Sequence, residues 1–394
     1  MLAVVETHPV QYHAPVYRVL QQQFGVPVTA IYGSDFSVRR YRDAEFGAAV
    51  TWGTDLLSGY AQHFLSRATD GAEPDLAALS AHGVGRLLRQ IAPAATLLVG
   101  YSPAFHRQAW YAAWRLGKPL LFRGETTDRA QTASGVTAAV RRIGLRHAYR
   151  TCARLLYIGE RSRRHYRDFG VDDARLVFAP YCVDTTPFRM DDDAREACRG
   201  EARAALGAGA DSVVVLYVGK LSWRKGVDLL PQAIQALPAE LRARIVLAVL
   251  GDGALREALA QQARDTGTAI RLLDVQSQDA LSRFYHAADM LVLPSRSGET
   301  WGLVVNEALH HGVPCVVSDR VGCAPDLIDA STGVVCEADS SAALGWAIGA
   351  AMELAGRPDV RERCRQRAAG YSVARAAQGI AEAYHAVADG QIAA

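Results

Sequence analysis

The feature that most constrains the fold is a series of short, continuous apolar segments in the second half of the chain. They are rich in valine, leucine and isoleucine and do not alternate with polar residues, which is typical of strands buried on both faces. These segments are Val213–Val218, Ile245–Leu250, Ile270–Leu273, Met290–Leu293 and 313–317. Helix-like stretches such as 254–264 and 279–287 lie between them. The alternation predicts a parallel, doubly wound sheet, whose ligands bind at the carboxyl ends of the strands.

The first half of the chain repeats this pattern less regularly. Its candidate strands are 2–5, 28–32, 96–99, 120–122, 155–158 and 176–178, and its candidate helices are 15–23, 104–116 and 135–150. Between the halves, residues 186–210 are mostly polar or small, which is typical of an interdomain linker. We therefore predict an α/β chain of two Rossmann-like, doubly wound domains, 1–185 and 211–370, with a cleft between them.

Composition excludes several classes of protein. Half of the 394 residues are hydrophobic and 21% are charged, so the chain is not intrinsically disordered. The formal net charge is only +2, and we predict that the protein binds no nucleic acid. Its seven cysteines form no C-x-x-C pair, which favours reduced thiols over a zinc site or disulfides. No apolar stretch approaches the roughly 18 residues of a membrane span, so we expect a cytoplasmic protein.

Charge is distributed unevenly along the chain. Residues 1–190 contain 23 basic and 15 acidic residues, a net charge of +8, whereas the remainder contains 20 and 26, a net charge of −6. Much of the basic excess lies within residues 141–167, in Arg141, Arg142, Arg146, Arg150, Arg154, Arg161, Arg163, Arg164 and Arg167. Such a region is either a solvated helix face or a surface for an anionic partner. We therefore keep peripheral contact with anionic membrane, at its inner face, as an open alternative.

Lysine is rare in this chain, which draws attention to where it occurs. Of the 43 basic residues, only Lys118, Lys220 and Lys225 are lysines. Two of them closely follow the predicted strand Val213–Val218. A lysine ammonium suits a diphosphate because it acts as a point charge without the bidentate geometry of arginine. Exposed surface lysines are the alternative interpretation, and the strand-end location favours an anion site.

A second candidate site begins where the predicted strand Met290–Leu293 ends. Gly302 permits close backbone approach and precedes a predicted helix, whose N-terminal N–H groups would form an anion site. Glu299 lies on the loop before this helix and Glu307 lies a little more than one turn into it. Carboxylates in such places can accept hydrogen bonds from the hydroxyls of a ribose or hexose.

These motifs together resemble those of the retaining family 4 glycosyltransferases of GT-B fold, and in the first half the similarity is to a bacterial polysaccharide or glycoconjugate subgroup. The segments that carry the resemblance are Gly219-Lys220, Lys225-Gly226, Gly251-Asp252-Gly253, Ala288-Asp289, Leu293-Pro294-Ser295, Glu299 with Glu307, Gly312-Val313-Pro314, Ser318-Asp319, Gly322, Cys182-Val183-Asp184 with Phe188, and Tyr371-Ser372. It implies an enzyme that moves a hexose from a nucleotide sugar, with UDP favoured, to a glycan, lipid-linked sugar or small-molecule glycoside.

The resemblance assigns roles to individual residues. Glu307 would hold the ribose hydroxyls, Glu299 would contact the donor sugar, and Lys225 would contact the phosphates. The donor-binding residues that it implies are Gly219, Lys220, Lys225, Glu299, Thr300, Trp301, Gly302, Leu303 and Glu307. Lys220, Lys225 and Glu299 would be the catalytic groups. The backbone of residues 300–303 would lie near the sugar and diphosphate.

The resemblance also assigns the domains. Residues 1–185 would bind the acceptor, 211–370 would bind the donor, and 371–394 would form a helix that crosses back to the first domain. In place of a double-glycine first loop, the chain has Thr7-His8-Pro9-Val10-Gln11-Tyr12-His13. Turns that follow strands place side chains at the ligand edge of such a sheet. The acceptor-binding candidates are His8, Gln11, His13, Arg123 and Glu125.

The family is understood to transfer the sugar on one face, with the leaving phosphate receiving the proton of the acceptor. No Asp-x-Asp pair stands at a strand end, and Asp191–Asp193 fall in the predicted linker. We therefore predict no essential metal and no cofactor apart from the nucleotide sugar. Two alternatives stay open: a GT-B epimerase or hydrolase of nucleotide sugars, and a non-catalytic nucleotide-binding scaffold. A dehydrogenase is disfavoured because no Gly-x-Gly-x-x-Gly follows the first strand.

Overall fold

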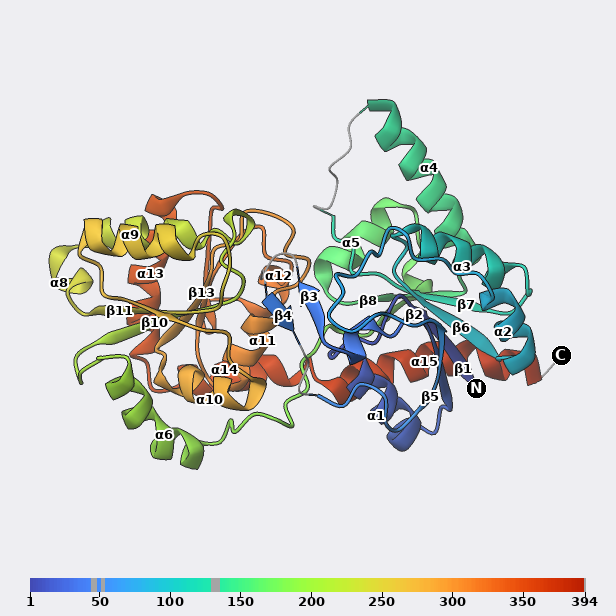
Figure 1. Cartoon of the computed structure of the whole chain (residues 1–394), viewed down its shortest axis with the longest axis horizontal. Helices are drawn as coiled ribbons and strands as arrows, with labels where there is room; N and C mark the ends of the chain where they lie inside the picture. The colour runs from blue at the N-terminus through green and yellow to red at the C-terminus, as the bar shows by residue number, and fades with distance from the viewer. Residues whose placement is uncertain (44–47, 51–53, 129–134, 393–394) are drawn as a thin grey trace. The chain divides into compact units, whose positions relative to one another are not determined.

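The computed structural model describes residues 1–43, 48–50, 54–128 and 135–392, which form two compact units. The first unit contains the described residues up to Cys182 together with those from Ser372 onward. The second contains Val183–Tyr371. Each unit is a parallel sheet with helices against it, so the predicted pair of Rossmann-like α/β domains is confirmed (Figure 1).

The first unit is built on a sheet with the strand order β5-β2-β1-β6-β7-β8-β9, in which every pairing is parallel. Its strands are β1 (Leu2–Glu6), β2 (Val28–Ser34), β5 (Ala61–Ser66), β6 (Ala95–Val99), β7 (Leu120–Arg123), β8 (Arg154–Tyr157) and β9 (Leu176–Phe178), with β3 (Tyr41–Asp43) and β4 (Ala48–Val50) as a separate antiparallel pair. Its helices are α1 (Ala14–Phe24), α2 (Val84–Ile91), α3 (Ala104–Trp114), α4 (Gly135–Thr151), α5 (Glu160–Asp168) and α15 (Val373–Ile392).

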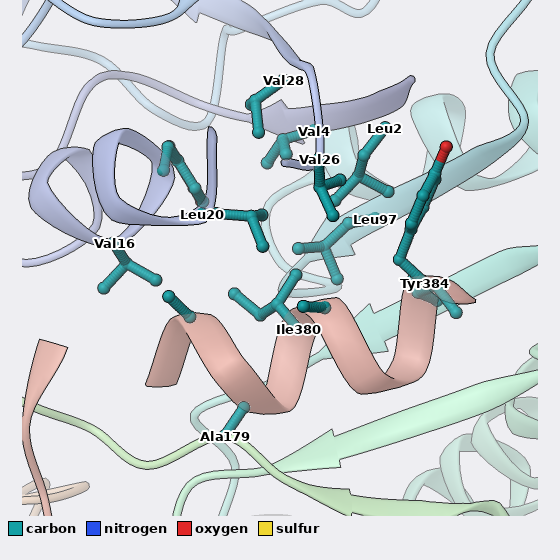
Figure 2. Packing of buried hydrophobic residues seen from close by; sticks show 14 of the residues in the cluster. Leu2, Val4, Val16, Leu20, Val26, Val28, Leu97, Ala179, Ile380 and Tyr384 are labelled. Atoms are coloured by element: carbon teal, nitrogen blue, oxygen red, sulfur yellow. The ribbon is translucent and has the colours of Figure 1, made fainter. Parts of the chain in front are cut away.

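Helix α15 completes the core of the first unit although it comes from the end of the chain. Figure 2 shows Ile380 of this helix directed at an apolar cluster that includes Leu20 and Leu97. The helix approaches the sheet closely at Gly379, where a Cβ atom would lie 2.0 Å from the carbonyl oxygen of Phe178. A larger residue cannot fit at this contact, and burial of the alanine-rich face of α15 removes apolar surface from water.

The second unit is built on a six-stranded parallel sheet with the order β12-β11-β10-β13-β14-β15. Its strands are β10 (Val213–Val218), β11 (Ile245–Leu250), β12 (Ile270–Leu273), β13 (Met290–Leu293), β14 (Cys315–Ser318) and β15 (Gly333–Cys336). Its helices are α6 (Asp192–Ala205), α7 (Leu230–Gln235), α8 (Ala239–Arg242), α9 (Arg256–Thr266), α10 (Gln278–Ala287), α11 (Leu303–His310), α12 (Ala324–Leu327), α13 (Ser341–Ala355) and α14 (Val360–Ala369). Four strands have the bounds that the apolar segments predict.

The structure differs from the predicted linker over residues 186–210, because helix α6 occupies most of this stretch and belongs to the second unit. The side chain of Asp191 caps the helix by accepting a hydrogen bond from Ala194 N at 2.7 Å. Arg199 and Arg203 then form ion pairs with the two carboxylate oxygens of Asp289, at 2.6 and 2.9 Å. The polar composition that resembles a linker therefore reflects a helix held by capping and ion pairs.

Candidate functional site

Lys225 and Glu299 come together in the second unit. Lys225 ends the short turn η3 (Trp223–Lys225), and Glu299 lies on the loop between β13 and α11. The Lys225 ammonium forms an ion pair with Glu299 Oε2, and the Ser295 hydroxyl donates a hydrogen bond to the same oxygen at 3.0 Å. Both charged side chains are largely buried, so the pair is shielded from water.

Arg296 fastens the Lys225 turn to the Glu299 loop. Its backbone N–H donates to the carbonyl oxygen of Arg224 at 2.8 Å, and its guanidinium donates to the carbonyl oxygen of Trp223 at 2.8 Å. The guanidinium also makes a two-point ion pair with Asp228, at 2.7 and 2.8 Å. Nothing in the sequence distinguishes Arg296, because in an arginine-rich chain its identity carries no signal.

Glycines at strand ends let backbone segments of this site approach one another. At Gly226, where φ is +68°, a Cβ atom would lie 2.3 Å from the carbonyl oxygen of Pro294. At Gly251, where φ is +146°, a Cβ atom would lie 2.0 Å from the carbonyl oxygen of Gly219. These contacts leave room for hydrogen only, which explains why the Lys225-Gly226 and Gly251-Asp252-Gly253 motifs contain glycine.

The remaining donor-site candidates on these turns are also positioned by backbone contacts. The Tyr217 hydroxyl donates to the carbonyl oxygen of Lys220 at 2.8 Å, which fixes the turn directly after β10. The Thr300 carbonyl lies 1.8 Å from where a Cβ atom of Gly322 would stand. The motif glycine at position 322 therefore permits the loop that carries Thr300 to pass close to the chain after β14.

Gly302 begins helix α11 at the edge of the sheet. It is the N-cap residue, with φ at 101°, and Leu303 is the first residue of the helix. The first N–H groups of an α-helix lack partners within the helix and attract anions. The side chain of Trp301, a predicted donor-binding residue, is 3% exposed, and its indole N–H donates to Asn306 Oδ1 at 2.7 Å. Its side chain is held inside the fold, and only its backbone can serve a ligand.

Glu307 lies inside the second unit with Tyr285 as its partner. Its carboxylate accepts a hydrogen bond from the Tyr285 hydroxyl at 2.6 Å. Burial raises the pKa of Glu307 to about 7, and the Tyr285 hydrogen bond only partly offsets this effect. His311 is the C-cap residue of α11, and its ring stacks on that of Tyr285 with the centroids 4.8 Å apart. Tyr285 was missed because no motif distinguishes it from core tyrosines.

A second polar cluster lies in the first unit, at the end of β1. His13 Nδ1 lies 2.7 Å from Glu6 Oε1, and the Tyr17 hydroxyl donates to the same oxygen at 2.6 Å. Burial opposes ionisation of Glu6, but the charge and hydrogen bond of His13 together with the Tyr17 hydrogen bond lower its pKa overall. Neither Glu6 nor Tyr17 was selected from the sequence, because Glu6 ends an apolar strand and Tyr17 lies in an apolar helix.

His13 and Glu125 are the two predicted acceptor residues that the structure brings together. His13 Nε2 lies 3.8 Å from Glu125 Oε1, and the Tyr181 hydroxyl donates to that oxygen at 2.6 Å. In the described structure, Glu6 Oε2 and His13 Nε2 are buried and accept or donate no hydrogen bond. A hydroxyl placed between His13 and Glu125 could bond to both, so this cluster can bind a polar ligand.

Arg123 differs from its prediction as an acceptor-binding group. It is 4% exposed, and its guanidinium donates to the carbonyl oxygens of Ala179 and Pro180 at 3.4 and 2.9 Å. It therefore supports the chain after β9. His8 lies beside the Thr7 hydroxyl, with its ring 4.4 Å from that of Phe36, and burial lowers its pKa to about 4. Gln11 is buried in the same loop.

Two general properties bear on the chemistry. Within the described residues, no group of three or more histidine, cysteine, aspartate or glutamate side chains is arranged to hold a metal ion. The same residues contain no helix that is long and apolar enough to cross a membrane.

Comparison with known proteins places this site in a family. Residues 199–370 match the family model described as glycosyl transferases group 1. The chain is 30% identical over 315 residues to a D-inositol 3-phosphate glycosyltransferase of Nocardia farcinica, an alignment that covers 73% of this chain and 67% of that protein. It is 32% identical over 268 residues to a GDP-mannose-dependent phosphatidylinositol monomannoside mannosyltransferase of Mycolicibacterium smegmatis, covering 63% and 68%.

Two further D-inositol 3-phosphate glycosyltransferases are matched over 60% and 65% of their length, so the chain spans less than two thirds of them. Among solved structures, HepE of Anabaena in complex with UDP superimposes with a TM-score of 0.71 at 15% identity, covering 98% of this chain and 99% of that one. That likeness concerns the fold alone. The chain therefore belongs to the glycosyl transferases group 1 family and has the GT-B fold of two Rossmann-like α/β units.

Proposed function

We propose that the protein transfers a hexose from a nucleotide sugar to a hydroxyl acceptor, with retention of the anomeric configuration. The observation that carries the proposal is the buried ion pair between Lys225, on the turn after β10, and Glu299, on the loop that leads into the N-terminus of α11. A diphosphate needs positive charge and N–H donors, and a sugar needs groups that accept hydrogen bonds from its hydroxyls; the Lys225 turn and the Glu299 loop together offer all three kinds of group.

Each donor-site residue then has a defined task. Lys225 and Lys220 neutralise the diphosphate, together with the N–H groups that begin α11. Glu299 accepts hydrogen bonds from hydroxyls of the donor sugar, with Ser295 and Lys225 fixing its orientation. Glu307 accepts hydrogen bonds from the ribose hydroxyls while the Tyr285 hydroxyl holds its Oε2 atom. When the diphosphate binds, the Lys225 ammonium contacts both a phosphate oxygen and the Glu299 carboxylate.

The reaction proceeds on one face of the sugar. The bond from the anomeric carbon to the leaving phosphate oxygen breaks, the bond to the acceptor oxygen forms, and the acceptor proton passes to the leaving phosphate. The diphosphate gains negative charge as this happens, and the two lysines with the α11 N-terminus stabilise that charge. Because these cations do what a divalent metal does in other transferases, we propose that the reaction needs no metal.

The identities of the nucleotide and of the acceptor are proposed from less specific observations. The solved HepE complex contains UDP, whereas the relative from Mycolicibacterium smegmatis is named for GDP-mannose. We propose a UDP-hexose donor. The acceptor hydroxyl, from a glycan, a lipid-linked sugar or a small-molecule glycoside, binds at the His13–Glu125 cluster of the first unit.

The test is transfer itself. The protein is incubated with UDP-glucose, UDP-galactose or GDP-mannose and a panel of glycoside acceptors, and products are identified by mass spectrometry and by the anomeric proton coupling in NMR. An α-linked product from an α-linked donor, formed equally in EDTA, is expected. Hydrolysis or epimerisation of the donor without transfer would contradict the proposal, as would an inverted product.

A further inference from the structure

One face of the first unit exposes large apolar side chains that its fold does not need at the surface. On helix α3, Tyr111 is 57% exposed and Trp114 is 52% exposed. On helix α4, Val140 is 64% exposed and Ile143 is 60% exposed. These residues, with the groove between the two helices, are called the α3–α4 surface below. Single exposed apolar residues are ordinary, but four on two adjacent helices form a patch that asks for a partner.

The two helices also enclose a groove of about 740 Å³. Its lining is mainly apolar and aromatic and includes Trp110, Tyr111 and Trp114 on one side and Leu145 and Ala148 on the other. A hydrogen bond joins the two helices: the indole N–H of Trp110 on α3 donates to the hydroxyl of Thr151, the last residue of α4, at 3.0 Å. Helix α4 stands out from the body of the first unit, and its C-terminal end lies beside α3 (Figure 1).

The charge of the α3–α4 surface is of one sign. Neither α3 nor α4 contains an aspartate or glutamate, whereas Arg107 and Arg141 line the groove and Arg115 directly follows α3. Arg150 is exposed on the last turn of α4. Some arginines cover aromatic rings, as Arg115 does over Tyr111 at 5.8 Å. The patch is thus apolar at its centre and cationic around it, so charge complementarity calls for an anionic partner.

We propose that the α3–α4 surface docks this protein on the headgroup layer of an anionic lipid bilayer. Tryptophan and tyrosine favour the boundary between hydrocarbon and water, because they have a large apolar body and a polar group. Arginines beside them attract acidic headgroups while their stems remain in the apolar layer. A second copy of the chain is a poorer partner, because a two-fold contact would bring the same positive charges together. This inference does not depend on the identity of the sugar donor.

The test is co-sedimentation of the full chain with two kinds of vesicle, one of pure phosphatidylcholine and one with about one third phosphatidylglycerol. We expect binding to the anionic vesicles only, and weakening with added NaCl. Replacing Arg107 and Arg150 by glutamate should reduce binding more than tenfold, since removal of each basic residue alone weakens such binding by about fivefold. Trp114→Ala combined with Ile143→Ala should reduce it even at low salt, because these side chains supply the apolar part.

Matched controls come from exposed residues of the second unit. Trp346→Ala, at a tryptophan that is 69% exposed, and Arg283→Glu, on α10, should leave vesicle binding unchanged. Circular dichroism and melting temperature establish that every variant is folded. Equal binding to neutral vesicles, an equal loss in the control variants, or no binding to either vesicle would overturn the proposal. So would sedimentation equilibrium showing a dimer that Trp114→Ala dissociates, because the surface would then be occupied by a second copy.

Discussion

Lys225 and Glu299 form a largely buried ion pair in the second unit, although 74 positions separate them along the chain. One follows the first strand of this unit's sheet and the other follows the fourth, and β10 and β13 are neighbours in that sheet. Parallel neighbours end at the same edge, so their turns meet there. The pair therefore joins two sequence motifs into one proposed diphosphate and sugar site.

The first prediction concerns Lys225. Lys225→Ala should lower the turnover of sugar transfer by about 10² to 10³, because a cation that stabilises developing charge is lost. It should also destabilise the unit by about 1–3 kcal/mol, since Glu299 keeps a buried charge without its ion-pair partner. Adding Glu299→Gln should restore much of the stability but not the turnover. Steady-state kinetics and urea unfolding measure the two effects, and Arg264→Ala on α9 serves as the exposed control. A double variant that regains activity would contradict this role.

The second prediction concerns Glu307, whose pKa in the folded protein is raised to about 7 from 4.5. Between these values the folded state keeps a proton that the unfolded state has lost, so stability falls as pH rises through this window. Above pH 7 the buried, ionised Glu307 therefore lowers the free energy of unfolding by about 3 kcal/mol. Glu307→Gln should raise the melting temperature at about pH 8 and have little effect near pH 4, while weakening nucleotide binding. The same stabilisation at both pH values would show that the charge is not responsible.

The third prediction uses two glycines that have the same backbone conformation but different surroundings. Gly226 has φ +68° with Pro294 O against it, whereas Gly267 has φ +66° with nothing within 4 Å of a Cβ atom. Gly267→Ala should lower the free energy of unfolding by about 1 kcal/mol through left-handed strain, and Gly226→Ala should lower it markedly more. Gly226→Ala should also reduce nucleotide affinity, because the Lys225 turn must move. Thermal unfolding and calorimetric titration with UDP measure both. Equal effects of the two substitutions would show that the close approach of Pro294 O to Gly226 does not matter.

The fourth prediction separates the two units. His13→Gln should reduce transfer to a hydroxyl acceptor by tenfold or more while leaving the affinity for UDP unchanged, because His13 belongs to the first unit and the proposed nucleotide site to the second. His63→Gln, at an exposed position on β5, is the matched control. Transfer kinetics measure the rate of transfer to the acceptor, and calorimetric titration measures the affinity for UDP. A parallel loss of UDP affinity would place His13 outside an acceptor role.

The sequence predicted the central strands well, because strands buried on both faces appear as continuous apolar runs, as in β10, β11 and β13. It missed β5, whose side chains are exposed or half-buried at the edge of the sheet, and it took α6 for a linker. Motif residues on turns, such as Lys225 and Glu299, were selected because their residue types are rare or placed after strands.

Buried residues that hydrogen-bond to the site carboxylates could not be predicted in this way. Tyr285 and Tyr17 reach Glu307 and Glu6 from helices whose sequences resemble any core helix, so only packing identifies them. Arg123 shows the opposite error. Its place at a strand end favoured a ligand role, but burial directs its guanidinium to backbone carbonyls. Position at a ligand edge predicts a site, whereas side-chain direction depends on tertiary contacts.

The central claim, that Glu307 and the Lys225–Glu299 pair bind a nucleotide sugar, is tested most directly by thermal unfolding with UDP, GDP and dTDP sugars. A ligand that binds only the folded state, at about one hundred times its Kd, stabilises it by about 2.7 kcal/mol. We expect a clear rise in melting temperature with a UDP sugar, which is lost in Glu307→Ala and retained in Trp346→Ala. No rise with any of these donors, or the same rise in Glu307→Ala, would contradict it.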